Sequence, residues 1–463
     1  MEIKIKGLDE TITYEKLDNG LEVYLYNKKT FHNNYVTFTT KFGSINTEFF
    51  DKTTNKKIKV PSGIAHFLEH KVFAQETGPE PSDYFSSNGA ISNAYTTFKN
   101  TTYLFQGTEK LKENLLFLLD FVQSPYFTKE NVEKEKGIIT QEIHMCDDRP
   151  VNVLFEAIRK NTLHKNNFKN SIIGTIEDIN KITPELLTKC YTTFYHPSNM
   201  FVVISGSFDE KEILEALAQN QKAKTFPDIK KYPEEQIKEP DTIVKPQEII
   251  KIPTDVAKIA YTIKINPQSL NIDKRKLNIY LYILFNLLFS DVSKFDYDMK
   301  KAKIITSTLS YNLLDTDTHL LISLINETDK YEELIKEIDK NLKNININDD
   351  TLMYTQNDNK NFRHVKYWHN GFNSVEILKG DTKKVIGYIS KYMTKDIDDR
   401  LFSKHRYFYS QNLIKPKNNF IDLDNEKEVK FYNEKIQDKE LIYQNNYINS
   451  FDNENVLFLE FKK

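Results

Sequence analysis

The run His66-Phe67-Leu68-Glu69-His70 contains the residue types from which proteins build a zinc hydrolase site. Residues four apart on an α-helix lie on the same face, so the imidazoles of His66 and His70 can reach one tetrahedral metal ion. Glu69 lies beside them, where its carboxylate can take a proton from a water whose pKa a zinc ion lowers towards about 7. This spacing predicts a metal-dependent hydrolase. The competing interpretation is an amphipathic helix with two structural histidines.

A third protein ligand is needed, and the acidic residues Glu133, Glu135 and Glu142 are candidates. Glu135 and Glu142 are two helical turns apart, so they lie on one face of a helix. One can bind the metal while the other accepts a hydrogen bond from a histidine ligand. Carboxylates near the apolar stretch 137–139 are costly to bury unless paired or metal-bound. The alternatives are a solvated helix face and, for Cys146, a small packed residue that is not a ligand.

The elements around these motifs predict an α+β domain. The turn at Asn19-Gly20 precedes an alternating strand, and Pro61-Ser62-Gly63 precedes the helix that carries the histidines. Thr128 begins the helix that carries the acidic residues. The further predicted strands are 34–43, 92–98, 101–105 and 200–206, and the further predicted helices are 110–123 and 209–218.

A segment rich in Pro, Lys and Glu, residues 225–247, is typical of an interdomain linker. After it the order of strand, long helix, two strands and helix loosely repeats. We therefore predict two tandem α+β repeats, each a mainly antiparallel sheet packed with helices. Residues 1–224 would form the catalytic zinc-binding domain and residues 248–463 a second, non-catalytic one. Beyond about residue 350 the pattern weakens, and we interpret that tail as packed in preference to an interaction surface.

Composition excludes several classes of protein. The 463 residues contain 64 Lys and Arg against 66 Asp and Glu, a net charge of −2, which argues against a dedicated nucleic-acid binder. Two cysteines cannot form a disulfide framework and fit a reducing compartment. The first residues lack the apolar core of a signal peptide, and the longest apolar run, 279–289, is too short to span a bilayer. We expect a cytoplasmic protein without a membrane span.

These motifs together resemble the pitrilysin/insulysin metallopeptidases, the inverted zincins, which also include the mitochondrial processing peptidases. The resemblance is specific over about residues 1–225 and weak afterwards, and it is nearest to the bacterial branch of the YmfH type. In that branch a zinc-bearing subunit pairs with a zinc-less relative. The matching segments are 19–21, 43–44, 63–70, 93–98, 101–105, 133–142 and 195–200.

The resemblance implies a role for individual residues. One zinc ion per chain would be held by His66, His70 and Glu142, with Glu69 as general base. Glu135 would be the carboxylate that orients a histidine ligand. The segment Asn93-Ala94-Tyr95 would be a strand edge to which an extended substrate adds through main-chain hydrogen bonds. For Asn93, a position in a turn or at a strand end is an equally weighted alternative.

The chain departs from the family pattern in its second half. Relatives that complete the site from that half carry an Arg in a turn after a long helix and a Tyr about ten residues further on, which stabilise the oxyanion. Here Lys294 stands at the Arg position and Ile305 or Thr306 at the Tyr position, while Tyr297 and Tyr311 are out of register. Oxyanion donors contribute about 10²–10³ in rate. We therefore expect a partner to supply them; otherwise Lys294, Arg400 or Arg406 must do so.

The sequence thus predicts a zinc metalloendopeptidase subunit that hydrolyses short or unfolded peptides and is completed by a zinc-less homologous subunit in a heterodimer. By analogy with the bacterial branch, its task would be leader removal or maturation of a modified peptide or bacteriocin. The alternative is a non-catalytic core or scaffold subunit of a peptidase-like complex.

Overall fold

The chain divides into two units in a computed structural model, Met1–Thr382 and Lys383–Lys463. The structure describes residues 1–5, 10–51, 56–227, 237–270 and 272–343 in full. Beyond them it describes only strands: β13 (Tyr354–Gln356), β14 (Phe362–Val365) and β15 (Val375–Glu376) in the first unit, and the antiparallel pair β16 (Leu441–Ile448) and β17 (Asn455–Phe461) in the second. Arg400 and Arg406 lie outside the described residues.

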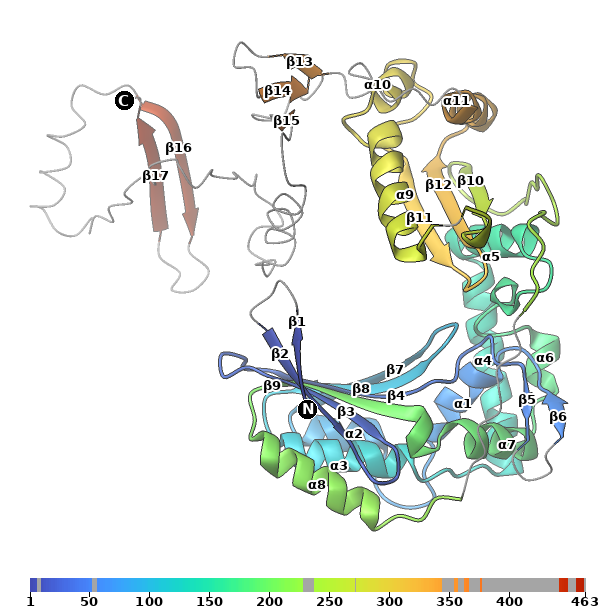
Figure 1. The fold of residues 1–463 in the computed structure, drawn as a ribbon, viewed down its shortest axis with the longest axis vertical. Helices are drawn as coiled ribbons and strands as arrows, with labels where there is room; N and C mark the ends of the chain where they lie inside the picture. The colour runs from blue at the N-terminus through green and yellow to red at the C-terminus, as the bar shows by residue number, and fades with distance from the viewer. Residues whose placement is uncertain are drawn as a thin grey trace, which may run out of the picture. The chain divides into compact units, whose positions relative to one another are not determined.

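A seven-stranded sheet organises the first part of the chain (Figure 1). Its strand order is β1-β2-β3-β9-β4-β8-β7, and every neighbouring pair is antiparallel except β3 with β9. The strand β7 therefore ends the sheet and pairs only with β8 among the described strands. The bounds are β1 (Glu2–Ile5), β2 (Glu10–Lys16), β3 (Glu22–Asn27), β4 (Asn34–Thr40), β7 (Ala90–Thr96), β8 (Thr101–Gly107) and β9 (Met200–Gly206).

Alternation along these strands buries one face of the sheet. In β4, for example, Val36 and Phe38 are fully buried, Thr37 between them is half-buried and Tyr35 before them is exposed, as expected for a period of two. Helices cover the buried face, as Figure 1 shows below the sheet. They are α1 (Ile64–Val72), α2 (Pro81–Ser87), α3 (Leu111–Val122), α7 (Pro184–Phe194) and α8 (Glu210–Lys222).

The helix α4 (Lys129–Asp147) begins where the sequence predicts. Thr128 accepts a hydrogen bond from the backbone N–H of Asn131, and the Asn131 side chain accepts one from the backbone N–H of Thr128. This reciprocal cap satisfies two backbone donors that the first turn of a helix leaves unpaired. The shorter elements of this part are β5 (Glu48–Phe50), β6 (Lys57–Lys59), α5 (Pro150–Thr162), α6 (Ile176–Asn180) and the 3₁₀ turns Asn167–Lys169 and Pro197–Asn199.

A second α+β element set follows residue 257. Its antiparallel sheet has the order β10-β12-β11, formed by β10 (Lys258–Ile265), β12 (Leu320–Glu327) and β11 (Ser310–Asp315). Helices α9 (Lys274–Phe289), α10 (Lys294–Lys301) and α11 (Tyr331–Lys343) pack on it, and Gln268–Leu270 is a 3₁₀ turn. The order repeats β4-β8-β7 of the first sheet, with helices again between the first strand and the hairpin. The predicted α+β class with mainly antiparallel sheets is confirmed.

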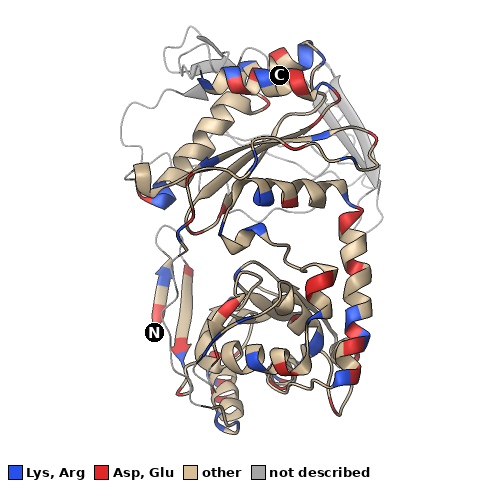
Figure 2. Cartoon of the chain, turned by 90° about the vertical axis from the view of Figure 1, so that its right-hand side faces the viewer, with Lys and Arg blue, Asp and Glu red and all other residues tan. Residues whose placement is uncertain are grey.

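Basic and acidic residues occur on the same helices of this fold (Figure 2). Figure 2 shows Lys and Arg interspersed with Asp and Glu along the helices. In the part of the chain that the structure describes, no helix is long and apolar enough to cross a membrane. The predicted boundaries 1–224, 225–247 and 248–463 stay a prediction; residues 237–257 contain no helix or strand.

Candidate metal centre

The helix α1 is almost entirely buried, which fixes its side chains in place. Its N-cap, Gly63, has a φ of 82°, and a Cβ there would lie 2.4 Å from the carbonyl oxygen of Ile173, so only glycine fits. Ile64, Phe67, Leu68 and Val72 pack into the core. The opposite side presents His66 and His70 to helix α4. The helix is thus held on one side by apolar packing and carries its polar residues on the other.

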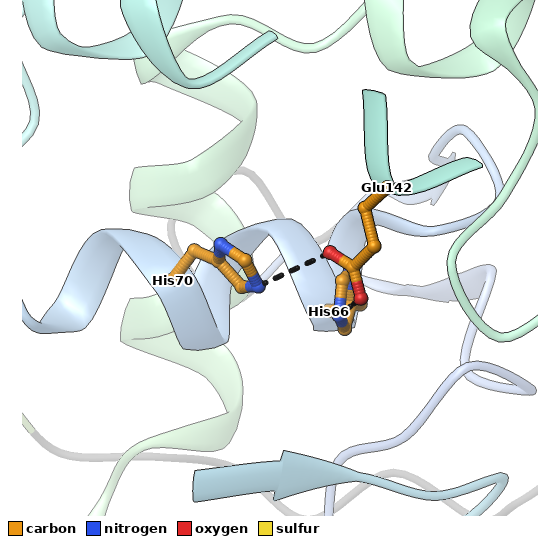
Figure 3. A group of neighbouring side chains, drawn as sticks. All are labelled: His66, His70 and Glu142. Carbon is orange, nitrogen blue, oxygen red and sulfur yellow. Dashed lines mark ion pairs between the residues drawn. The ribbon is translucent and has the colours of Figure 1, made fainter. Parts of the chain in front are cut away.

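Three side chains from the two helices converge (Figure 3). Nε2 of His66 lies 3.6 Å from Oε1 of Glu142, and Nε2 of His70 lies 3.6 Å from Oε2 of the same carboxylate. One donor atom of each residue lies within 4.8 Å of the other two. A separation of 3.6 Å is too long for a good hydrogen bond. Two ligands about 2.1 Å from one tetrahedral ion are about 3.4 Å apart, so the spacing fits metal ligands.

The two imidazoles differ in their protonation. Burial lowers the pKa of His66 to about 3, so His66 is neutral and its Nε2 lone pair is available. Burial alone would lower the pKa of His70 as well, but the hydrogen bond to Glu135 and the surrounding carboxylates raise it above its usual value. The raised pKa favours the imidazolium form of His70, so a metal ion must displace a proton from its Nε2 to bind there. Two imidazoles and a carboxylate are a donor set that zinc binds in proteins.

Glu135 holds the ring of His70 from the side away from Glu142. Its Oε1 lies 3.0 Å from Nδ1 of His70, and its Oε2 lies 3.3 Å from the ammonium of Lys71. In the neutral ring, a hydrogen on Nδ1 leaves the lone pair on Nε2, which is the atom that faces Glu142. Burial favours the neutral carboxyl of Glu135, yet His70 and Lys71 outweigh it and lower its pKa.

Glu69 is buried beside the cluster. Burial raises the pKa of its carboxyl, and a hydrogen bond donated by Oγ1 of Thr96 to Oε2, 2.5 Å long, works in the opposite direction. Sequence reasoning missed Thr96. It lies in the matched segment 93–98, but nothing in the sequence shows that its hydroxyl reaches α1.

The remaining predicted residues lie outside the cluster of His66, His70 and Glu142. Asn93, Ala94 and Tyr95 lie inside β7, the edge strand, so Asn93 occupies a strand position and not a turn. Ala94 packs against the core while Asn93 and Tyr95 are exposed. Their contact with a substrate stays a prediction. Glu133 is exposed and pairs with Lys136, so it does not join the cluster. Cys146 is a half-buried thiol outside the cluster as well.

In the second half, the residues aligned with the family's Arg and Tyr do not form an oxyanion site of that kind. Lys294 is exposed at the start of α10 and forms an ion pair with Asp298, 2.6 Å long. Ile305 is buried and Thr306 is exposed. Tyr311 lies on β11 against the aromatic ring of Phe285.

Sequence comparison matches the chain to two family models in succession. The model "Insulinase (Peptidase family M16)" matches residues 57–176, and "Peptidase M16 inactive domain" matches residues 181–351. The chain is 39% identical to the zinc protease YmfH of Bacillus subtilis over 311 residues, which cover 67% of this chain and 72% of that protein. It is 27% identical to a zinc protease of Rickettsia bellii over 48% of this chain and 54% of that protein.

Solved structures give the same result. A putative M16-like peptidase from Alicyclobacillus acidocaldarius matches with a TM-score of 0.66 and 32% identity, over 74% of this chain and 80% of that one. A protease from Helicobacter pylori shares the fold, with a TM-score of 0.61 at 22% identity over 72% and 79%. The matched segments contain both helices of the candidate metal centre. The chain therefore belongs to peptidase family M16, the insulinase family.

Proposed function

We propose that the chain is the zinc-bearing subunit of a metalloendopeptidase, with one zinc ion per chain held by His66, His70 and Glu142. The observation that carries the proposal is the convergence of these three donors from α1 and α4, at separations that suit one tetrahedral ion. The zinc proteases among the relatives support the choice of metal. A bound zinc ion would supply Lewis-acid chemistry for peptide hydrolysis.

The protein residues perform the remaining tasks. Glu69 takes a proton from the attacking water and delivers it to the leaving amine, because its buried carboxylate stands one residue from His70. Glu135 keeps Nδ1 of His70 protonated and its ring oriented. The strand β7, at the edge of the sheet among the described strands, binds the substrate as an added strand at Asn93-Ala94-Tyr95. Strand addition requires an extended backbone with unpaired amides, so the substrates are short or unfolded peptides.

A zinc-less homologous subunit completes the site in this proposal. The support comes from the second half of the chain, where Lys294, at the position of the family's Arg, forms an ion pair with Asp298. Between residues 248 and 343 the one arginine is Arg275, in the first turn of α9 and not after its end. Removal of a leader from a modified peptide in the cytoplasm is the specific task that we propose, by analogy with the bacterial relatives.

The variant Glu69→Gln tests the catalytic assignment. We expect it to retain zinc at the wild-type ratio and to lose cleavage of an unstructured peptide by about 10²–10⁴-fold, because the amide cannot accept the proton. Glu133→Gln, an exposed glutamate of α4 outside the cluster, serves as the matched control and should retain activity. A tagged Glu69→Gln chain recovered from the native cell should bring a homologous subunit and uncut peptide with it. Full cleavage by Glu69→Gln would contradict the proposal.

A non-catalytic core subunit is the second candidate. It is favoured by the match of residues 181–351 to the "Peptidase M16 inactive domain" model. The two candidates differ in metal content, because a core subunit has no need for zinc. Purification without chelator, followed by elemental analysis, separates them: zinc at one per chain supports the peptidase, and its absence supports the core subunit.

A further inference from the structure

The carboxylate of Glu69 is fixed by a residue outside the metal cluster. Oγ1 of Thr96 lies 2.5 Å from Oε2 of Glu69. Thr96 is the last residue of β7, while Glu69 lies in the last part of α1, so the contact joins the edge strand to the helix of the candidate centre. Side chains at alternate positions of β7 face opposite ways, and Ala94, two residues earlier, packs towards the same core.

The neighbouring hydroxyl of Thr101 determines which group donates the hydrogen in this contact. Thr101, on β8, lies opposite Thr96 with the two hydroxyl oxygens 3.3 Å apart. The hydroxyl of Thr101 donates its single hydrogen to the carbonyl oxygen of Phe42, at 2.9 Å. The hydrogen of Thr96 can then go to Thr101 or to Glu69. The shorter contact with a carboxylate is the stronger one, so Thr96 donates to Glu69.

We propose that Thr96 is a positioning residue for Glu69, which ties one carboxylate oxygen of the base to the strand that binds the substrate. Oε2 is engaged by Thr96, and Oε1 is left to accept the proton from the attacking water. Because the same strand carries Asn93-Ala94-Tyr95, the contact fixes the position of Glu69 relative to the backbone of the bound substrate. Misplacement of a reacting group by about 1 Å can reduce a rate by about 10²-fold, so this relative position affects turnover more than binding. The inference rests on the proposed function.

Two substitutions separate the hydroxyl from the space that Thr96 fills. Thr96→Val replaces the hydroxyl by a methyl group of similar size, and Thr96→Ser keeps the hydroxyl without the methyl. We expect Thr96→Val to lower kcat by about 10–100-fold, the range found when a residue that orients a functional group is lost, with KM and zinc content unchanged. Thr96→Ser should restore most of kcat. The assays use the native subunit complex and an unstructured peptide.

The same sheet offers a matched control. Thr39 and Thr102 form a buried cross-strand pair with hydroxyl oxygens 3.0 Å apart, on β4 and β8. Thr39→Val removes the same chemical group from the same sheet, where the hydroxyl contacts Thr102 and not Glu69, and should leave kcat unchanged. A purely structural role for Thr96 predicts equal losses for Thr96→Val and Thr96→Ser, accompanied by lower thermal stability.

The outcomes distinguish this inference from the proposed function. If Glu69→Gln abolishes cleavage while Thr96→Val keeps the wild-type kcat, the positioning role is wrong and the peptidase assignment stands. If Glu69→Gln cleaves normally, or the wild-type complex does not cleave, the proposed function itself is wrong. Loss of kcat in Thr96→Val together with its recovery in Thr96→Ser supports the positioning role.

Discussion

Nδ1 of His70 and Oε1 of Glu135 lie 3.0 Å apart, which joins helix α1 to helix α4 directly beside the candidate metal ligands. The contact leaves Nε2 of His70 directed at Glu142, 3.6 Å from its Oε2. The same two helices therefore supply the donors and the group that orients one of them. Residues of this kind commonly change metal affinity without touching the metal.

Glu135→Gln should weaken zinc binding by about 10–100-fold, because the neutral amide makes a weaker hydrogen bond to Nδ1 and no longer fixes the tautomer. A competition titration with a chromogenic zinc chelator measures the affinity. Glu133→Gln lies on the same helix but away from His70, so its affinity should equal that of the wild type. An unchanged affinity in Glu135→Gln would mean that Glu142 and packing alone orient the ring.

Removal of Glu142 should abolish the stabilisation that zinc gives. A ligand that binds only the folded state raises the free energy of unfolding by about 2.7 kcal/mol at 100 times its dissociation constant. EDTA should therefore lower the Tm of the wild-type chain and leave the Tm of Glu142→Gln unchanged. Differential scanning fluorimetry with and without added zinc measures both. A chelator effect that persists in Glu142→Gln would place the metal elsewhere.

Lys71 is a buried cation whose ammonium contacts Glu135 at 3.3 Å. Lys71→Met should lower the free energy of unfolding of the zinc-free chain by about 1–3 kcal/mol, because the half-buried carboxylate of Glu135 loses a charged partner. Urea unfolding followed by circular dichroism provides the measurement. Lys181→Met removes an exposed lysine that pairs with Glu177, and stability should not change. Equal stability of Lys71→Met and the wild type would show that the hydrogen bond from His70 alone is enough to stabilise the charged carboxylate of Glu135.

Much of the local structure was predictable because its signals are short in range. The Thr128 cap begins α4, the alternating pattern after Asn19-Gly20 marks β3, and Pro61-Ser62-Gly63 precedes α1. The convergence of His66, His70 and Glu142 followed from helical spacing together with the family resemblance. In each case residues near one another in sequence, or on one helix face, carry the information.

Other features depend on contacts that sequence spacing does not encode. The parallel pairing of β3 with β9 joins segments far apart in the chain. The hydroxyl of Thr96 reaches Glu69 only once β7 packs on α1. Helices α5 and α7 were not among the predicted elements, although each has a proline in its first turn and α7 has a Thr183 cap, signals that are typical of a helix start.

The connection between the two α+β element sets also became visible only in the structure. The buried carboxylate of Glu239 lies 2.7 Å from the ammonium of Lys264 on β10, and that lysine also donates to the carbonyl oxygen of Thr162 at the end of α5. Glu239 further accepts hydrogen bonds from three consecutive backbone N–H groups, those of residues 164–166, at 2.7–2.8 Å. The carboxylate of Glu239, in the segment before β10, thus contacts the first element set at residues 164–166 and the second at Lys264.

This arrangement predicts a defined dependence of stability on pH. Burial favours the neutral form of Glu239, but Lys264 and the backbone N–H groups outweigh it and lower its pKa from 4.5 to about 2. A carboxyl whose pKa is lower in the folded than in the unfolded state stabilises the fold fully above about pH 4.5. This stabilisation is lost as the pH falls from about 4.5 to 2. Glu239→Gln should therefore be less stable than the wild type at pH 7, and the difference should shrink progressively below pH 4.5.

Urea unfolding of both chains at a series of pH values between 7 and 2.5 measures this difference directly, because titrations shared by the two chains cancel. Glu248→Gln is the matched control. Its carboxylate also pairs with a lysine, Lys245, but in an exposed position where water screens the interaction. The stability difference between that variant and the wild type should stay small at every pH. A difference for Glu239→Gln that does not vary with pH would show that shape, and not the charge of the buried carboxylate, holds the two element sets together.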